Sequence, residues 1–126
     1  MQARVKLSAV LAAVIAAAAV AALAAPALAG PVEAHASATK KVQIGDNYYL
    51  PKKLKVKKGT TVTWNWPDIG DTHDVKLSKG PKGAKKFKSA EAAAEFKFAQ
   101  KLKVPGKYDI VCTLHKEMTM TITVGK

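Results

Sequence analysis

Cysteine is almost absent from this chain of 126 residues, in which Cys112 stands alone. A single cysteine excludes an internal disulfide. It calls for one of three explanations, namely a bridge between two molecules, a buried unreactive thiol, or a metal ligand. Histidine is scarce as well, with only His35, His73 and His115 in the sequence. Any metal site built from sulfur and nitrogen donors must therefore draw on very few residues.

Arginine is missing after Arg4, and acidic residues are few. From Gly30 onward the sequence has nineteen lysines against nine aspartates and glutamates, a net charge of +10 with the histidines neutral. Such a surplus favours acidic protein partners, or an anionic membrane or cell wall, through long-range attraction. The lysines are spread along the chain with no nucleic-acid-binding motif, so we expect no nucleic-acid partner.

Long hydrophobic runs are also absent, apart from one at the N-terminus. Arg4 and Lys6 precede an apolar stretch over residues 7–25, and Ala27-Leu28-Ala29 offers a small-x-small cleavage site. This layout predicts a secretory signal peptide over residues 1–29. The run is longer than the usual ~7–15 residues, so an uncleaved membrane anchor is the alternative. Under either interpretation we expect an exported protein, periplasmic, extracellular or held at the cell surface.

The rest of the sequence predicts a flexible lead-in over residues 30–39 and one domain over residues 40–126. Short runs that alternate, or that are rich in β-branched and aromatic residues, are separated by turn signals, which predicts about seven strands and a β-sandwich. The conformation of residues 91–102 is ambiguous. Ser89 is a plausible N-cap for an alanine-rich segment with helix propensity, whereas Phe96-Lys97-Phe98 alternates like a strand.

The densest group of potential metal ligands lies near the C-terminus. Cys112, His115 and Met118 follow one another at intervals of three residues, in a loop between two strand-like runs. A thiolate and a thioether are soft donors and an imidazole is borderline, so this set suits copper that changes oxidation state. His73, at the boundary of a loop and a strand, is the candidate fourth donor. Each residue alone would more often be a packing or surface residue, and their coincidence is what favours a metal.

The run Gly106-Lys107-Tyr108-Asp109-Ile110-Val111-Cys112-Thr113-Leu114-His115, continuing to Met118, resembles the G-x-Y-x-x-x-C-x-x-H-x-x-M signature of the cupredoxins, the type 1 blue copper proteins. The segment from Leu50-Pro51 to Trp64 resembles two strands of that family. The resemblance implies a Greek-key β-sandwich of seven to eight strands with a short helical turn near residues 89–94. It also implies one copper ion (Cu+/Cu2+), one-electron transfer, and no enzyme activity.

By matching position, the resemblance implies that His73, Cys112 and His115 are the equatorial ligands and that Met118 is the axial one. Met120 is the rival, because its spacing from His115 is similar to that of plastocyanins. The shorter spacing to Met118 is similar to that of amicyanins, and we therefore expect Met118 to be the ligand and Met120 to pack in the last strand.

Two residues depart from the family pattern. Asp74 stands where many relatives have asparagine, and we expect it to bond across to Thr113. Lys116 follows the second histidine, where relatives usually have proline, and it puts a positive charge where the partner-docking patch normally lies.

The leading hypothesis is a monomeric, exported blue copper protein that carries single electrons. Acidic redox partners would dock near His115, with Ile69 and Leu114 in the contact rim. One alternative is a copper-binding or copper-delivery protein without a role in an electron chain. Another is an interaction module that holds no copper.

Overall fold

The computed structural model describes residue 30, residues 37–67 and residues 70–126. Regular structure in this part of the chain consists of eight strands without a helix: β1 (Thr39–Gly45), β2 (Tyr48–Leu50), β3 (Lys53–Lys57), β4 (Thr60–Trp66), β5 (Lys76–Lys79), β6 (Phe96–Leu102), β7 (Gly106–Val111) and β8 (Thr119–Gly125). The signal peptide predicted over residues 1–29 and most of the predicted lead-in lie outside the described residues and stay predictions. No helix among the described residues is long and apolar enough to cross a membrane.

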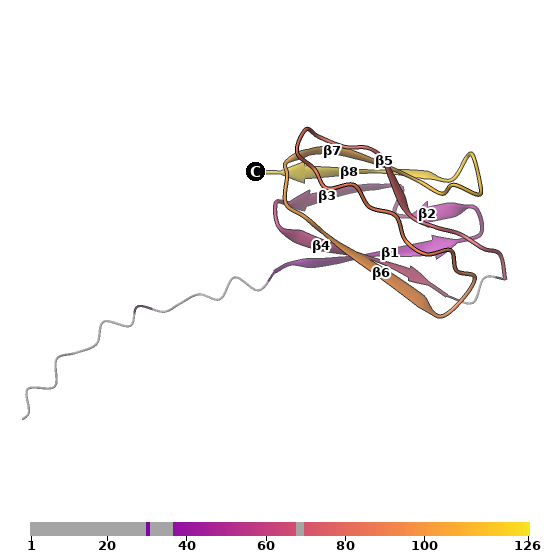
Figure 1. Cartoon of the computed structure of the whole chain (residues 1–126). Coiled ribbons are helices and arrows are strands. Elements are labelled where there is room, and N and C mark those ends of the chain that lie inside the picture. The colour runs from indigo at the N-terminus through magenta and orange to yellow at the C-terminus, as the bar shows by residue number, and fades with distance from the viewer. Residues whose placement is uncertain (1–29, 31–36, 68–69) are drawn as a thin grey trace, which may run out of the picture. The chain divides into compact units, whose positions relative to one another are not determined.

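The strands form two sheets that face each other as the layers of a sandwich (Figure 1). One sheet has the order β2-β1-β4-β6 and the other the order β3-β8-β7-β5. β1 is parallel to β4 and β3 is parallel to β8, whereas the other neighbouring strands are antiparallel. The predicted all-β sandwich of seven to eight strands is confirmed.

Alternating burial along the strands builds the core between the sheets. Every second residue is buried in two central strands: Thr60, Val62, Trp64 and Trp66 in β4, and Met120, Ile122 and Val124 in β8. The ring of Trp64 lies 6.0 Å from that of Phe87 and 5.8 Å from that of Phe98. Because a large apolar side chain contributes roughly 1.5–3 kcal/mol when it is fully buried, this shared core is the main source of the stability of the sandwich.

The short helical turn predicted near residues 89–94 is wrong. Ser89 donates its backbone N–H to the carbonyl of Val75 at 2.8 Å, and its hydroxyl accepts the N–H of Val75 at 2.9 Å. Ala92 pairs with His73 in an isolated β-bridge. Since these backbone groups bond to the segment that follows β4, they are not free to form a helical turn, and tertiary pairing overrides the local propensity. The strand at Phe96–Leu102 is present, and the residues before it form a bend rather than a helical turn.

Two other local expectations also change. His73 is expected at the boundary of a loop and a strand, but the strand that follows it, β5, begins only at Lys76. Tyr48-Tyr49-Leu50, in which the sequence shows no strand pattern, forms the edge strand β2, with Tyr49 fully buried.

Four connections meet at one end of the sandwich, on the right in Figure 1: the β1–β2 turn, the β4–β5 loop, residues 89–95 and the β7–β8 loop. The strand register brings them together, because Gly45 pairs with Tyr48, Trp66 with Phe96, and Val111 with Thr119. We call this the loop end. The β3–β4 and β6–β7 turns lie at the opposite end with the C-terminus.

Replacing Ile122, whose side chain is fully buried, by alanine should lower the free energy of unfolding by about 2–5 kcal/mol because it leaves a cavity in the shared core. Replacing the exposed neighbour Thr123 by alanine should change it by no more than about 0.5 kcal/mol. Urea denaturation of the two variants measures the difference. Equal stability would show that the inner face of β8 is not part of the core.

Candidate metal centre

Three of the predicted ligands converge at the loop end. His73 comes from the β4–β5 loop, Cys112 directly follows β7, and His115 lies in the β7–β8 loop. The Nδ1 atoms of the two histidines are 3.0 Å apart, and Cys112 Sγ lies 3.6 Å from Nδ1 of His115 and 4.0 Å from Nδ1 of His73. Residues thirty-nine positions apart in the sequence therefore aim their donor atoms at a common point.

The donor atoms fit a single metal ion. An ion at ordinary bond lengths of about 2.0 Å to nitrogen and about 2.3 Å to sulfur can touch donors that are spaced this closely. One thiolate with two imidazoles is a soft and borderline set of the kind that suits copper. Burial, and secondarily the neighbouring His115, hold the pKa of His73 below its usual value. His73 is thus neutral at neutral pH, with a ring nitrogen available to bind a metal.

The backbone around His73 is held firmly. Its N–H donates to the carbonyl of Ala92 at 2.9 Å, and its own carbonyl accepts the N–H of Ala92 at 3.0 Å and Nε1–H of Trp66 at 3.2 Å. The side chain is fully buried, and its Nε2 has no hydrogen-bond partner within the described part of the chain. Nδ1 is the ring atom that faces Cys112 and His115, so a metal ion would bind to His73 through Nδ1.

Met118 and Met120 occupy different environments. The β7–β8 loop closes on itself, since Cys112 N–H donates to Met118 O and Met118 N–H donates to His115 O, each at 3.0 Å. Met118 is buried where these two hydrogen bonds close the loop. Met120 lies within β8 opposite Ile110, and its Sδ accepts a hydrogen bond from Trp64 Nε1 at 3.3 Å. Met120 therefore packs in the core, as the sequence predicts.

Asp74 ties the two ligand loops together. Its Oδ1 accepts the backbone N–H of Thr113 at 2.6 Å, its Oδ2 accepts the hydroxyl of Thr113, and Lys88 Nζ lies 3.4 Å from Oδ2. The bond expected from the sequence is present. Burial alone would raise the pKa of Asp74, but the bonds from Thr113 and Lys88 outweigh burial and hold the pKa below its usual value. Because Asp74 follows His73 and Thr113 follows Cys112, this pair fixes the two ligands relative to each other.

Sequence reasoning also missed Tyr49 and Asp71, which support the site. The hydroxyl of Tyr49 donates to the carbonyl of Asp74 at 2.6 Å, and burial, with Cys112 and Asp74 as smaller influences, raises the pKa of Tyr49. Asp71 Oδ2 lies 3.2 Å from Nε2 of His115, an interaction that orients the ring with Nδ1 toward Cys112. An irregular YYLP segment and a loop aspartate carry no local signal of either role.

The surface of the site lies at His115, whose side chain is 26% exposed, whereas Cys112 is 4% exposed. Leu114 is 45% exposed beside it, and Lys116 is also exposed. Ile69, which the sequence places in the contact rim, lies outside the described residues.

Replacing Asp74 by alanine should lower the free energy of unfolding of the metal-free protein by about 2–4 kcal/mol, because it removes a fully buried carboxylate that accepts two hydrogen bonds from Thr113. Asp74→Asn keeps an acceptor for the N–H of Thr113 and should therefore lose less stability than Asp74→Ala. The stability that depends on Asp74 is fully present above its ordinary pKa of 3.8 and is lost as the pH falls through the lower value in the folded protein. Denaturation curves between neutral and acidic pH should show this loss in the natural protein but not in Asp74→Asn. Identical pH profiles would contradict the role of the carboxylate.

Similarity to known proteins supports a copper site. The plastocyanin/azurin family of copper-binding proteins matches residues 36–125. Amicyanin-alpha of Methylorubrum extorquens is 33% identical over 92 residues, which cover 73% of this chain and 76% of that protein.

Among solved structures, the reduced Cu(I) form of an amicyanin variant superposes with a TM-score of 0.61 at 29% identity, covering 69% of this chain and 82% of the variant. A copper-containing nitrite reductase from Thermus scotoductus matches with a TM-score of 0.57 at 25% identity, covering 68% of this chain but only 22% of the reductase. The chain therefore belongs to the plastocyanin/azurin family of copper-binding proteins.

Proposed function

We propose that this protein is an exported type 1 copper protein that carries single electrons between redox partners, with His73, Cys112 and His115 as equatorial ligands and Met118 as the axial ligand. One observation carries the proposal: two imidazole Nδ1 atoms and one thiol converge within 4.0 Å in a largely buried site. Copper, when bound, supplies a reversible change between Cu(I) and Cu(II). The similarity to amicyanin supports an electron carrier, and the chain is not an enzyme.

The protein's own part is to hold the donors still. His73 is fixed by Ala92 and Trp66, and Asp74 joins its loop to that of Cys112. Donors that are held in one arrangement need little movement when the metal changes oxidation state. Four protein donors around one ion would also leave no position for a substrate, which is what an electron carrier requires.

Burial favours a carrier over a copper-delivery protein. His73 is fully buried and Cys112 nearly so, and only the ring of His115 reaches the surface. A protein that hands its metal to an acceptor needs at least two ligands within reach of that acceptor. An electron carrier needs only one exposed ligand edge, and His115 provides it.

Partners would dock at the loop end, over Leu114 and the edge of His115. The sequence predicts acidic partners from the overall lysine surplus. The placement of the charges limits which lysines such a partner could reach near His115. Lys116 is the lysine that adjoins His115, and the other charged residues in the loops of this end are acidic apart from Lys88, which pairs with Asp74. An acidic partner would therefore have to bond to Lys116 in particular, against the acidic side chains of the neighbouring loops.

Adding copper(II) to the metal-free protein should produce the intense visible absorption of a thiolate bound to copper, together with the EPR spectrum of a type 1 site. Cys112→Ser should abolish the absorption, because the thiolate is its source. His35→Asn, which removes a histidine that we do not expect to be a ligand, should leave both spectra unchanged. A colourless copper complex of the natural protein would defeat the proposal, and rapid transfer of the copper to a chelator would favour delivery instead.

Replacing Met118 by leucine should raise the reduction potential, because loss of the axial thioether removes a donor and leaves a more apolar site. We expect a change on the order of tenfold in the redox equilibrium constant, about 59 mV for a one-electron couple. Met120→Leu, in the core below, is the matched control and should leave the potential nearly unchanged. If Met120→Leu alone shifts the potential, the axial ligand is Met120. Voltammetry of the copper-loaded variants decides between them.

A further inference from the structure

The charges of the domain are segregated between its two ends. Of the seven acidic residues in the described part of the chain, all but Asp109 lie in the connections of the loop end: Asp46, Asp71, Asp74, Glu91, Glu95 and Glu117. The opposite end carries exposed lysines in the β3–β4 turn, in the loop after β5 and around the end of β6. The surplus of positive charge is therefore concentrated away from the metal centre.

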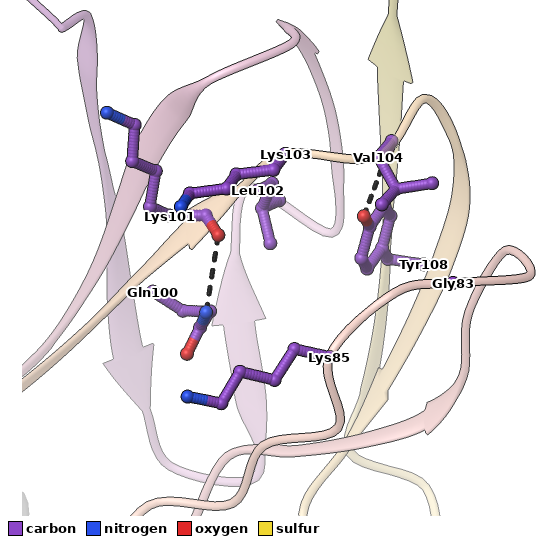
Figure 2. A pocket seen from close by; sticks show the side chains of 8 residues that line it. All are labelled: Gly83, Lys85, Gln100, Lys101, Leu102, Lys103, Val104 and Tyr108. Atoms are coloured by element: carbon purple, nitrogen blue, oxygen red, sulfur yellow. Dashed lines mark hydrogen bonds between the residues drawn. The ribbon is translucent and has the colours of Figure 1, made fainter.

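These lysines form one continuous surface. A recess of about 480 Å³ is lined by Lys85, Lys101 and Lys103, with Gln100 between them and Tyr108 in its wall (Figure 2). A neighbouring recess of about 330 Å³ is lined by Lys57 and Lys58 and again by Lys101. Two backbone bonds hold the elements together, from Gly59 to Leu102 at 2.7 Å and from Lys58 to Gly125 at 3.0 Å. We call this surface the lysine end and define it by Lys57, Lys58, Lys85, Lys101 and Lys103.

The lysine end has no acidic partner within the described part of the chain. No acidic residue lines either recess, and the three ion pairs found among the described residues involve Lys88, Lys107 and His115 instead. A group of exposed ammonium ions without counter-charges attracts a polyanion, and the attraction weakens with salt.

We propose that the lysine end docks on the anionic headgroups of a phospholipid membrane. The chain enters the domain at this end, since the hydroxyl of Ser37 donates to Gly59 O and the N–H of Thr61 donates to Ala38 O. The apolar run over residues 7–25 precedes that point in the sequence. The exposed large apolar side chains of the described part, on Tyr48, Leu50 and Leu114, belong to other regions. Docking is thus electrostatic, without insertion of the domain, and it turns the loop end with His115 away from the membrane.

The test uses the full-length chain and two kinds of vesicle, pure phosphatidylcholine and phosphatidylcholine mixed with phosphatidylglycerol. Lysine reactivity is mapped by acetylation and mass spectrometry. On the anionic vesicles Lys57, Lys101 and Lys103 should become several-fold less reactive than on neutral vesicles. The exposed strand lysines nearer the loop end, Lys53, Lys76 and Lys97, should not. Because the two groups of lysines are compared within the same molecules, the difference between the groups reports the orientation of the domain.

Two variants with the same loss of charge complete the test. Lys57→Gln, Lys101→Gln and Lys103→Gln together should lower the ratio of anionic to neutral vesicle binding about a hundredfold, since each lysine near an anionic surface contributes roughly fivefold. The control carries Lys53→Gln, Lys76→Gln and Lys97→Gln and should lower the ratio far less. The effect should vanish in molar salt.

Equal losses in the two variants would mean that net charge alone attracts the protein, which overturns the proposal. Equal protection on neutral vesicles would overturn it too, because the N-terminal segment would then account for binding. Stronger retention on duplex DNA than on the anionic vesicles at the same salt would reassign the lysine end to nucleic acid. None of these outcomes depends on whether copper is bound, so failure here is distinguishable from failure of the proposed electron carrier.

Discussion

The bond between Asp74 and Thr113 is the interaction on which the metal centre depends. The β4–β5 loop that carries His73 leaves one sheet and enters the other, while Cys112 follows a strand of the second sheet. His73 and Cys112 are far apart in the sequence, so the chain between them does not fix their distance in space. A fully buried carboxylate that accepts two hydrogen bonds from Thr113 does so, because buried polar groups strongly favour the one arrangement in which they are satisfied. The position next to each ligand is therefore as important to the site as the ligand itself.

Hydrogen bonds from the first sheet also hold the metal centre in place. Tyr49 bonds to the carbonyl of Asp74, and Trp66 and Ala92 bond to the carbonyl of His73. These contacts come from β2, from β4 and from the segment before β6, so both the edge and the centre of one sheet support the ligand loop. The resulting cradle leaves His73 Nδ1 aimed at Cys112 and His115, although its Nε2 has no partner among the described residues. Folding thus brings together donors that a metal ion can satisfy.

The candidate ligands could be identified in the sequence because they are rare residue types at a characteristic spacing. Cys112, His115 and Met118 stand close together in the chain, and His73 is one of only two other histidines. The supporting residues could not be found this way. They act through contacts that exist only after the sheets form, as Tyr49, Asp71 and Ala92 do. Ala92 contributes only its backbone, so its residue type gives no indication of its role. The helical turn predicted near residues 89–94 failed for the same reason, since pairing with His73 and Val75 decides the conformation of that segment.

The net charge of the protein does not show where its charged side chains lie. A surplus of +10 suggests that any surface, including the one over His115, will attract acidic partners. The fold instead gathers acidic side chains into the loops around the metal centre and leaves unpaired lysines at the other end of the strands. Long-range attraction to an anionic surface then orients the molecule as well as increasing its affinity for that surface. The lysine end is attracted by the negative field, whereas the acidic loop end is repelled by it. A domain built in this way can be held at its lysine end while His115, the exposed member of the candidate ligands, stays available at the loop end.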